Sequence, residues 1–330
     1  MRSPRWRESW TLRLKSSGNT SASTGTQRAR HAERVQERRP QTGMNPLGAP
    51  KRSPRHRLAD ELAGSDVELD LGRASLLIAA EEYPQLCVDL YLARLDQVAE
   101  EVKDRLANET APLIVLEDLL KTLFERRKFR GNRKAYYDPR NSFLNDVLDR
   151  GAGIPLTLGI VLLEIGWRLQ LPLEGVNFPG HFLVRYAGSE VRLLIDPFDG
   201  GAVRFEDEAQ KFLDMAYGGA VPMRSEFLRS ASKRDMLQRL LTNLKAIYSK
   251  IGDDRRALGV VERLLMMNPT APAECRARGL LLARLGRHED AAQQLEAYLR
   301  VSPSADDRGH VQGIVRDLRS GRYVTDKGLE

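Results

Sequence analysis

The spacing of apolar residues in residues 58–127 predicts a group of helices that cover a hydrophobic core. Leu113, Leu116, Leu120 and Leu123, for example, recur every three or four positions, as residues on one face of an α-helix do. The segments with this spacing span residues 74–82, 86–106 and 112–127. The first ordered part of the chain is therefore predicted to be helical, and we expect order to begin near Leu58.

A longer apolar run from Gly153 to Leu169 predicts the central helix of the domain. Pro155 suits the first turn, where the missing N–H of proline has no helical partner to lose. The residues that interrupt the run are Thr157, Gly159, Glu164, Gly166 and Arg168. A helix that is apolar nearly all round must be covered by the rest of the protein, and this one is too short to span a bilayer. Glu164 needs a partner there, and we expect a salt bridge rather than an acid–base role.

A turn and a short helix precede the central helix. Asn141 or Ser142 is placed to cap a helix over residues 143–150 that ends at Gly151. The preceding run Tyr136-Tyr137-Asp138-Pro139 is typical of a turn. Its tyrosines either line a cleft or pack into the core, and packing is the preferred interpretation because aromatic side chains dominate core energetics.

After the central helix, the sequence predicts a β-hairpin that brings one histidine next to one aspartate. Gly188-Ser189 has the glycine-first order that a two-residue type II′ turn requires. Because such a turn fixes the register, facing residues have numbers that sum to 377, as those of His181 and Asp196 do. Facing residues have Cβ atoms about 5 Å apart. Asp196 would then orient the imidazole of His181 as in a catalytic triad, although no nucleophile accompanies the pair.

The hairpin leads into a tight turn and one more helix. Residues 196–201, DPFDGG, combine proline and glycine as turns do. They lack the spacing of a P-loop or a GxGxxG motif, so no phosphate site is predicted. Residues 206–217 predict a helix, and Gly218, Gly219 and Pro222 begin a linker.

From Ser232 onward the chain contains two copies of a 34-residue repeat. The recurring positions pair Gly252 with Gly286, Ala257 with Ala291, Pro269 with Pro303, Tyr248 with Leu282, Val261 with Leu295 and Leu265 with Leu299. This period is that of tetratricopeptide repeats, in which each unit is a helical hairpin. Two repeats are fewer than the roughly three that are stable alone. We therefore expect them to pack on the central domain, with residues 311–318 as a capping helix.

The formal net charge of +7 would suggest a nucleic-acid partner if it were spread over the folded part of the chain, but it is not. Residues 1–57 hold fourteen Lys or Arg and three Glu, so this arm carries +11 and the remainder −4. No specific nucleic-acid partner is predicted for the folded part, although the arm suits non-specific phosphate binding. The arm is predicted to be disordered. It is typical either of an organellar transit peptide or of sequence upstream of a true start at Met44.

Cysteine and histidine usage predicts neither a disulfide framework nor a metal site. Cys87 and Cys275 form no CxxC motif, and no two of the five histidines have the spacing of a metal-binding pair. No metal and no cofactor are therefore predicted. Cys87, in a helical segment upstream of the hairpin, is a candidate nucleophile, whereas Cys275 is expected to pack in a repeat helix. We expect a reducing, cytoplasmic location and no membrane partner.

Three stretches carry a resemblance to a known family. They read YYDPRNSFLNDVLDRGAGIPLTLGIVLLEIGWRLQLPLEGVNFPGHFLV, LLIDPFDGG and RLLTNLKAIYSKIGDDRRALGVVERLLMMNP. They resemble the bacterial SirB-type family, in which a transglutaminase-like domain is followed by tetratricopeptide repeats, over residues 71–318. The resemblance implies an α+β, papain-like core with N-terminal helices and an all-α extension. The expected division is a basic arm (1–57), a transglutaminase-like domain (58–225) and the repeats with their capping helix (226–330).

The wider transglutaminase-like superfamily resembles papain-type enzymes, in which a cysteine begins a buried helix and a histidine and an aspartate lie on neighbouring strands. His181 and Asp196 match the latter two residues. The position of the cysteine corresponds to about Pro155, which has no nucleophilic atom. Thr157 offers a hydroxyl in the same turn, but a hydroxyl is far less ionised than a thiol at neutral pH. The resemblance thus implies a fold that has lost acyl-transfer activity.

Two functions stay open. The leading hypothesis is a non-catalytic scaffold or regulatory protein that binds a protein or peptide partner through the repeats or through the residual cleft. The cleft candidates are Tyr137, Asn141, Phe182 and Phe198, beside His181 and Asp196. The alternative is a hydrolase or acyltransferase in which His181 is the base, Asp196 orients it, and Thr157, Cys87 or an activated water attacks.

Overall fold

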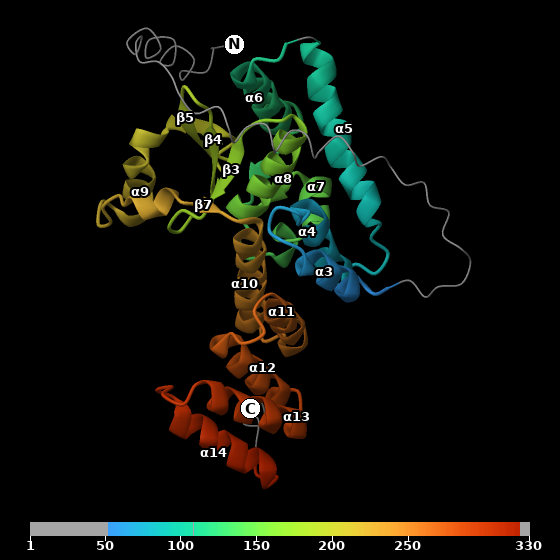
Figure 1. The fold of residues 1–330 in the computed structure, drawn as a ribbon, viewed down its shortest axis with the longest axis vertical. Helices are drawn as coiled ribbons and strands as arrows, with labels where there is room; N and C mark the ends of the chain where they lie inside the picture. Colours follow the sequence, from blue (N-terminus) through green and yellow to red (C-terminus); the bar gives the residue numbers. More distant parts are fainter. Residues whose placement is uncertain (1–51, 108, 324–330) are drawn as a thin grey trace, which may run out of the picture. The chain divides into compact units, whose positions relative to one another are not determined.

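The computed structural model describes residues 52–107 and 109–323 (Figure 1). The predicted disorder of the basic arm and the alternative start at Met44 concern residues 1–51, which lie outside the described residues. The first described helix, α3 (Pro54–Ala63), begins slightly before the predicted start of order at Leu58. The reason is local, because the Ser53 hydroxyl accepts a hydrogen bond from the His56 N–H and proline takes the first helical position.

The predicted N-terminal helices are present. They are α4 (Leu71–Ala80), α5 (Val88–Leu106) and α6 (Pro112–Leu120), and α6 continues into the π-helical turn η1 (Lys121–Arg126). Helix α4 is buried along its whole length, while α5 buries only the leucines and valines of one face. Cys87 forms the N-cap of α5, so it precedes this helix and does not lie within it.

The central helix α8 (Pro155–Arg168) is confirmed, and residues 155–166 are all buried. Its one buried carboxylate, Glu164, forms the expected salt bridge with Arg168 at 2.6 Å and accepts a hydrogen bond from Gly72 N at 2.9 Å. Burial raises the pKa of Glu164, while the Arg168 guanidinium opposes that shift. Since Gly72 begins α4, this carboxylate joins the central helix to the N-terminal helices.

The helix α7 (Leu144–Arg150) ends at Gly151, whose φ of 58° lies in the left-handed region, as predicted. The predicted cap is wrong. Phe143 occupies the N-cap position and makes no side-chain capping bond, while Asn141 belongs to the preceding 3₁₀ turn η2 (Pro139–Asn141). The side chain of Asn141 is directed to other backbone groups, which are described with the site.

Five strands form an antiparallel sheet in the order β6-β5-β4-β3-β7. Their bounds are β3 (Leu173–Val176), β4 (Leu183–Ala187), β5 (Arg192–Asp196), β6 (Ala202–Phe205) and β7 (Ser230–Ala231). A separate parallel pair joins β1 (Arg130–Gly131) to β2 (Ala152–Gly153). The chain is thus an α+β protein with a small sheet.

A helix covers each face of the sheet (Figure 1). Helix α8 approaches one face closely, because Gly159 faces the ring of Phe182 and Gly166 faces Leu173. Helix α9 (Gln210–Tyr217) covers the other face, where Phe212 and Leu213 pack in a cluster with Phe178 and Leu194. This second helix begins later than predicted, because residues 206–208 form a separate 3₁₀ turn.

The predicted hairpin register is wrong by two residues. Val184 pairs with Ile195 and Ala187 with Arg192, so four residues, 188–191, connect the strands. Gly188 does not have the positive φ that a type II′ turn needs, as the positive-φ glycines of the described chain do not include it. A shift of two residues leaves every side chain on its predicted face, since side chains alternate with a period of two.

The repeats consist of two helical hairpins and a capping helix. Their helices are α10 (Lys233–Ile251), α11 (Asp254–Met267), α12 (Pro272–Arg284), α13 (His288–Val301) and α14 (Arg308–Arg319). Gly252 and Gly286 make the turns at φ of 72° and 77°. The expected packing on the central domain is present, because α10 contacts α4 and α8, and α11 contacts α3. Arg256 pairs with Glu82 at 2.6 Å, and Arg263 donates to Ile78 O at 3.2 Å.

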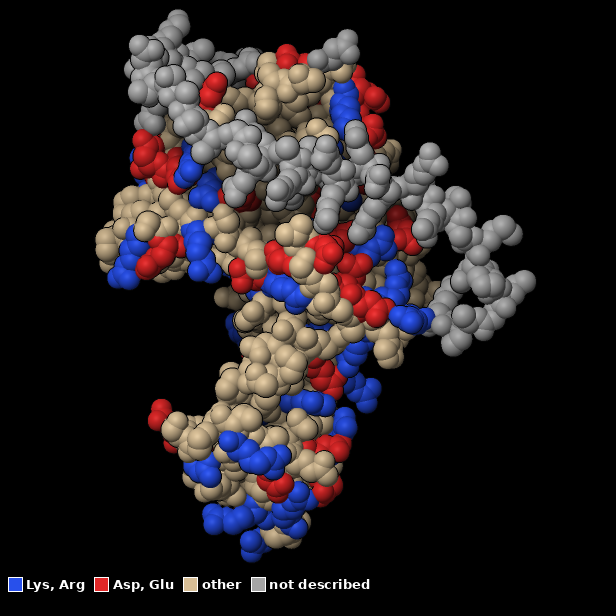
Figure 2. Space-filling model, in the orientation of Figure 1, with Lys and Arg blue, Asp and Glu red and all other residues tan. Residues whose placement is uncertain are grey.

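Acidic and basic side chains are interspersed over α3 and α4 in the face shown in Figure 2. Some of them form ion pairs between the N-terminal helices and the repeats, such as Arg55 with Glu262 and Arg263 with Glu81. The face over these two helices therefore has no uniform field of one sign, which an extended nucleic-acid surface would require.

We predict that Gly159→Ala destabilises the protein by about 1–3 kcal/mol, because the added Cβ must displace a packed ring. It would lie 2.5 Å from Cε1 of Phe182, which is fully buried. Gly309→Ala in α14 is the matched control. Nothing lies within 4 Å of its added Cβ, so the better helix propensity should raise stability by about 0.5–1 kcal/mol. Urea unfolding of both variants checks this, and equal shifts would contradict the close approach of α8 to the sheet.

Candidate functional site

His181 and Asp196 are in contact despite the shifted register. His181 Nε2 lies 2.9 Å from Asp196 Oδ1. The same oxygen accepts backbone hydrogen bonds from Phe198 N at 2.9 Å and Asp199 N at 3.1 Å. An oxygen that accepts two N–H groups is an acceptor for the imidazole as well, so Nε2 carries the ring proton and Nδ1 is the basic nitrogen.

Local turns place the imidazole at the entrance to β4. His181 N donates to Phe178 O at 3.0 Å, and Gly180 adopts a φ of 66° between them. Tyr217 from α9 lies against this turn, with its hydroxyl 2.7 Å from the position of a Cβ on Gly180. The paired residues of β4 and β5 begin at Val184 and Ile195, so His181 lies three residues before the first pair and Asp196 one residue beyond it. The rings of His181 and Phe198 meet edge to face at 6.2 Å.

The start of α8 is the position that corresponds to the cysteine of papain-type enzymes. Pro155 is buried in the first helical turn. Gly159, one turn further on, packs on Phe182, the neighbour of His181 in the sequence. The helix start therefore carries a side chain without any nucleophilic atom.

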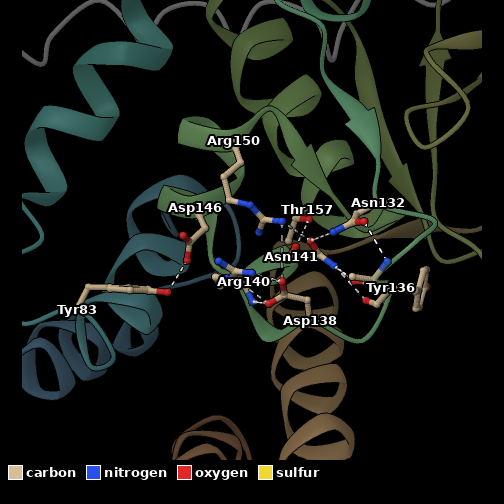
Figure 3. A network of polar contacts seen from close by, with 10 residues as sticks. Tyr83, Asn132, Tyr136, Asp138, Arg140, Asn141, Asp146, Arg150 and Thr157 are labelled. Carbon is tan, nitrogen blue, oxygen red and sulfur yellow. Dashed lines mark hydrogen bonds and ion pairs between the residues drawn. The ribbon is translucent and has the colours of Figure 1, made fainter.

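Thr157 is fully buried, and its hydroxyl already has partners (Figure 3). Oγ1 donates to Asn141 O at 2.7 Å and accepts from Ile154 N at 3.2 Å. These bonds join η2 to the first turn of α8, where Ile154 is the N-cap residue. The candidate nucleophile is thus occupied in structural hydrogen bonds, and no described bond connects it to His181.

Asn141 is fully buried and holds the loop before α7 in place. It is therefore not the cleft residue that the sequence predicts. Its amide donates to Ala135 O at 2.6 Å and Tyr136 O at 3.1 Å, and its Oδ1 accepts from Asn132 Nδ2 at 3.0 Å. Figure 3 shows these groups converging on Asn141. The residue therefore determines where the loop presents its tyrosines, without reaching the surface itself.

A salt bridge holds the same loop, and a hydrogen bond holds the helix α7 that follows it (Figure 3). Arg140 pairs with Asp138 at 2.8 Å, and the hydrogen bond from this guanidinium lowers the pKa of Asp138. The Tyr83 hydroxyl donates to Asp146 at 2.5 Å, and burial raises the pKa of both groups. These contacts connect the N-terminal helices, α7 and the loop into one framework.

The aromatic residues that the sequence suggests for the cleft differ in their burial. Phe182 is fully buried between α8 and the sheet, so it is not a cleft residue. Tyr137 is 64% exposed, which contradicts the preferred interpretation that it packs in the core. Phe198 lies between His181 and Tyr136, with the two ring pairs at 6.2 and 5.9 Å. A row of rings thus extends from the imidazole to the loop.

Sequence reasoning missed three contributors to this region. Arg239 and Lys250 come from α10, and Tyr217 comes from α9. The Lys250 ammonium lies 4.5 Å from the centre of the Tyr137 ring, and Arg239 Nη1 donates to Asn177 Oδ1 at 3.1 Å. Arg239 and Lys250 are three helical turns apart, so their shared face was visible in the sequence. Which part of the domain that face contacts was not visible.

No hydrogen bond of the described residues joins Cys87 or Cys275 to a histidine. Cys87 is exposed at the start of α5, and Cys275 is partly exposed in α12. Burial raises the pKa of the Cys275 thiol, which makes its reactive thiolate scarcer. Within residues 52–107 and 109–323 there is no group of three His, Cys, Asp or Glu side chains that could hold a metal ion. In the same residues no helix is both long and apolar enough to cross a membrane.

These features define a transglutaminase-like domain joined to helical repeats, and comparison with known proteins agrees. Residues 89–242 match the family model of the transglutaminase-like superfamily, and residues 244–315 match a tetratricopeptide repeat model. Tetratricopeptide repeats generally mediate protein–protein interactions. No solved structure matches the chain.

Bacterial relatives identify the family. The UPF0162 protein of Xylella fastidiosa strain 9a5c is 35% identical over 263 residues, which cover 79% of this chain and 94% of the relative. A UPF0162 protein of Pseudomonas aeruginosa is 31% identical over 70% of this chain and 84% of its own length. Protein SirB1 of Salmonella typhimurium is 30% identical over 69% of this chain and 85% of its own length. The chain belongs to this SirB-type family.

We predict that Thr157→Val destabilises the protein by about 1–3 kcal/mol, because it leaves the buried Asn141 carbonyl and Ile154 N–H without their partner. Thr157→Ser keeps the hydroxyl and should cost only about 1 kcal/mol for the lost methyl group. Chemical denaturation of the two variants measures the difference. Equal losses of stability would contradict the structural role of the hydroxyl.

Proposed function

We propose that this protein is a non-catalytic, cytoplasmic binding protein in which the transglutaminase-like domain and the repeats hold a protein or peptide partner. The observation that carries the proposal is an oriented histidine–aspartate pair without a reacting atom beside it. Asp196 holds His181 at 2.9 Å, the corresponding helix start carries Pro155, and the hydroxyl of Thr157 is occupied. Two free cysteines suit a reducing compartment.

Exposed groups beside the pair support binding. Tyr137 presents an exposed ring with the Lys250 ammonium above it, and Phe198 continues this row towards His181. Rigid aromatic rings next to cationic side chains are typical of surfaces that recognise polypeptides. Because Lys250 belongs to the first repeat helix, a single partner would contact the domain and the repeats together.

A second candidate function, hydrolysis or acyl transfer, is favoured by one observation. The Nδ1 atom of His181 has no hydrogen-bond partner among the described residues, so it is available to accept a proton. A water molecule activated there would be the attacking group. The first proposal is preferred because an oriented base alone provides only one of the groups that acyl transfer needs.

Pro155→Cys should turn the non-catalytic pair into a reactive one, because the thiol would stand at a helix N-terminus next to an oriented base. We expect p-nitrophenyl acetate to acylate this variant in a rapid burst of one p-nitrophenol per chain. The wild type should hydrolyse the ester no faster than His181→Ala. The burst should disappear when Pro155→Cys is combined with His181→Ala, whereas Cys87→Ala should leave it unchanged.

Two results of this experiment would count against the proposal or its geometry. Ester turnover by the wild type that His181→Ala abolishes would establish the second candidate function instead. A folded Pro155→Cys variant that reacts no faster than the wild type would show that this position does not face His181.

A photo-crosslinking residue at Tyr137 should capture a specific polypeptide in native cells, and the same residue at Leu285, in the turn that follows α12, should capture the same one. Leu90 in α5 is the control, since its exposure of 59% is close to the 64% of Tyr137. Mass spectrometry of the adducts identifies the captured chain. Adducts at Leu90 that equal those at Tyr137, or none at Tyr137 and Leu285, would remove the binding proposal.

A further inference from the structure

Arg239 connects the repeat segment to the turn that carries His181. It extends from α10, yet its Nη1 donates to Asn177 Oδ1 at 3.1 Å, and its Cζ lies 6.0 Å from the ring centre of Phe182. Asn177 follows β3 and Phe182 precedes β4, so both belong to the connection that contains His181. A residue of the first repeat helix thus reaches the histidine–aspartate site.

The charge of this guanidinium is not compensated within the described chain. No carboxylate of the described residues lies within ion-pair distance of it, and its neighbours Asn177, Tyr136 and Tyr217 are uncharged. Burial lowers the pKa of Arg239, in line with this environment. Removing a charge from water without a partner costs free energy, which an anion bound there would offset.

Several partly buried arginines of the described chain have acidic partners, whereas the guanidinium of Arg234 donates to backbone carbonyls and that of Arg278 to the Gln294 amide. Arg168 pairs with Asp96 and Glu164, both at 2.6 Å, and Arg185 pairs with Glu174 at 2.5 Å. Arg263, in the same repeats, has Glu81 at 3.4 Å. Arg239 differs from these ion-paired arginines in that its partner is a neutral amide, which accepts only one of its five N–H groups.

Resting on the proposed function, we infer that Arg239 is the carboxylate-binding residue of the partner site. A guanidinium binds a carboxylate through two parallel hydrogen bonds, and the single bond to Asn177 leaves other N–H groups of Arg239 for this purpose. The carboxylate belongs to a peptide, either as its C-terminus or as an Asp or Glu side chain. Lys250, about 16 Å further along the same helix face, stands over Tyr137 and would contact the next part of that peptide.

Three fluorescein-labelled octapeptide libraries test this inference with the full chain. The first has free C-termini and neither Asp nor Glu, the second has one Asp or Glu and amidated C-termini, and the third is amidated and has neither. Affinity selection followed by fluorescence anisotropy should give binders from the first or the second library, which identifies the source of the carboxylate. Arg239→Gln should weaken them at least about tenfold, and Arg239→Lys should weaken them less.

Two controls separate recognition from a structural role. Arg255→Gln removes an exposed cation from α11 and should leave binding unchanged. Arg239→Gln should melt at the wild-type temperature or above it, because it removes a partly buried charge that has no acidic partner among the described residues. A lower melting temperature together with lost binding would overturn the inference, as would equal binding of neutral amidated peptides or unchanged affinity in Arg239→Gln. If no library yields a binder for the wild type, the proposed function fails along with the inference.

Discussion

The structure depends on covering a helix that is buried on every side. Residues 155–166 of α8 are shielded from solvent, and α4, α5, α7, α10 and the sheet all pack against it. Gly159 and Gly166 allow the sheet to approach at distances that a side chain would prevent. The one carboxylate inside, Glu164, is retained because Arg168 and the N-terminus of α4 both bind it. Each neighbouring element is therefore placed by the need to remove α8 from water.

The same requirement determines which atoms remain available for chemistry. The first turn of α8 is held by Thr157, whose hydroxyl bonds the Asn141 carbonyl and the Ile154 N–H. An oxygen used in this way cannot attack a substrate without breaking the contacts that begin the helix. Asp196 and His181 lie outside the helix and keep their geometry at little cost. The chain thus keeps an oriented histidine–aspartate pair, while the hydroxyl in the first turn of α8 is held in structural hydrogen bonds.

The periodic features of the fold could be predicted from the sequence, while features set by distant contacts could not. The helices, the 34-residue repeat and the glycines that end helices follow from local patterns, and they are found where expected. The predicted hairpin register is wrong because it depends on a type II′ turn at Gly188, and Gly188 does not adopt the positive φ that this turn needs. The pair was still found, since an error of two residues preserves the face of every side chain.

The site residues show the same division. Asn141 and Phe182 have the polarity and the position of cleft residues, but burial depends on what packs over them, and that comes from elsewhere in the chain. Residue type favours the core over a cleft for Tyr137, but the amide of Asn141 fixes its loop in a way that leaves the ring exposed. Arg239 lies 62 positions from its partner Asn177. No local pattern encodes such a contact.

The repeats pack on the domain that carries the site because they are too few to be stable without it. Two repeats do not bury enough surface to be stable alone, so α10 packs on α4 and α8 and becomes part of the domain core. Its inner face buries Met236, Leu237, Leu240 and Leu244. The adjacent face must then run past the turn of His181 and the loop of Tyr137, which is where Arg239 and Lys250 lie. The first repeat helix therefore contacts both the connection that contains His181 and the loop that contains Tyr137.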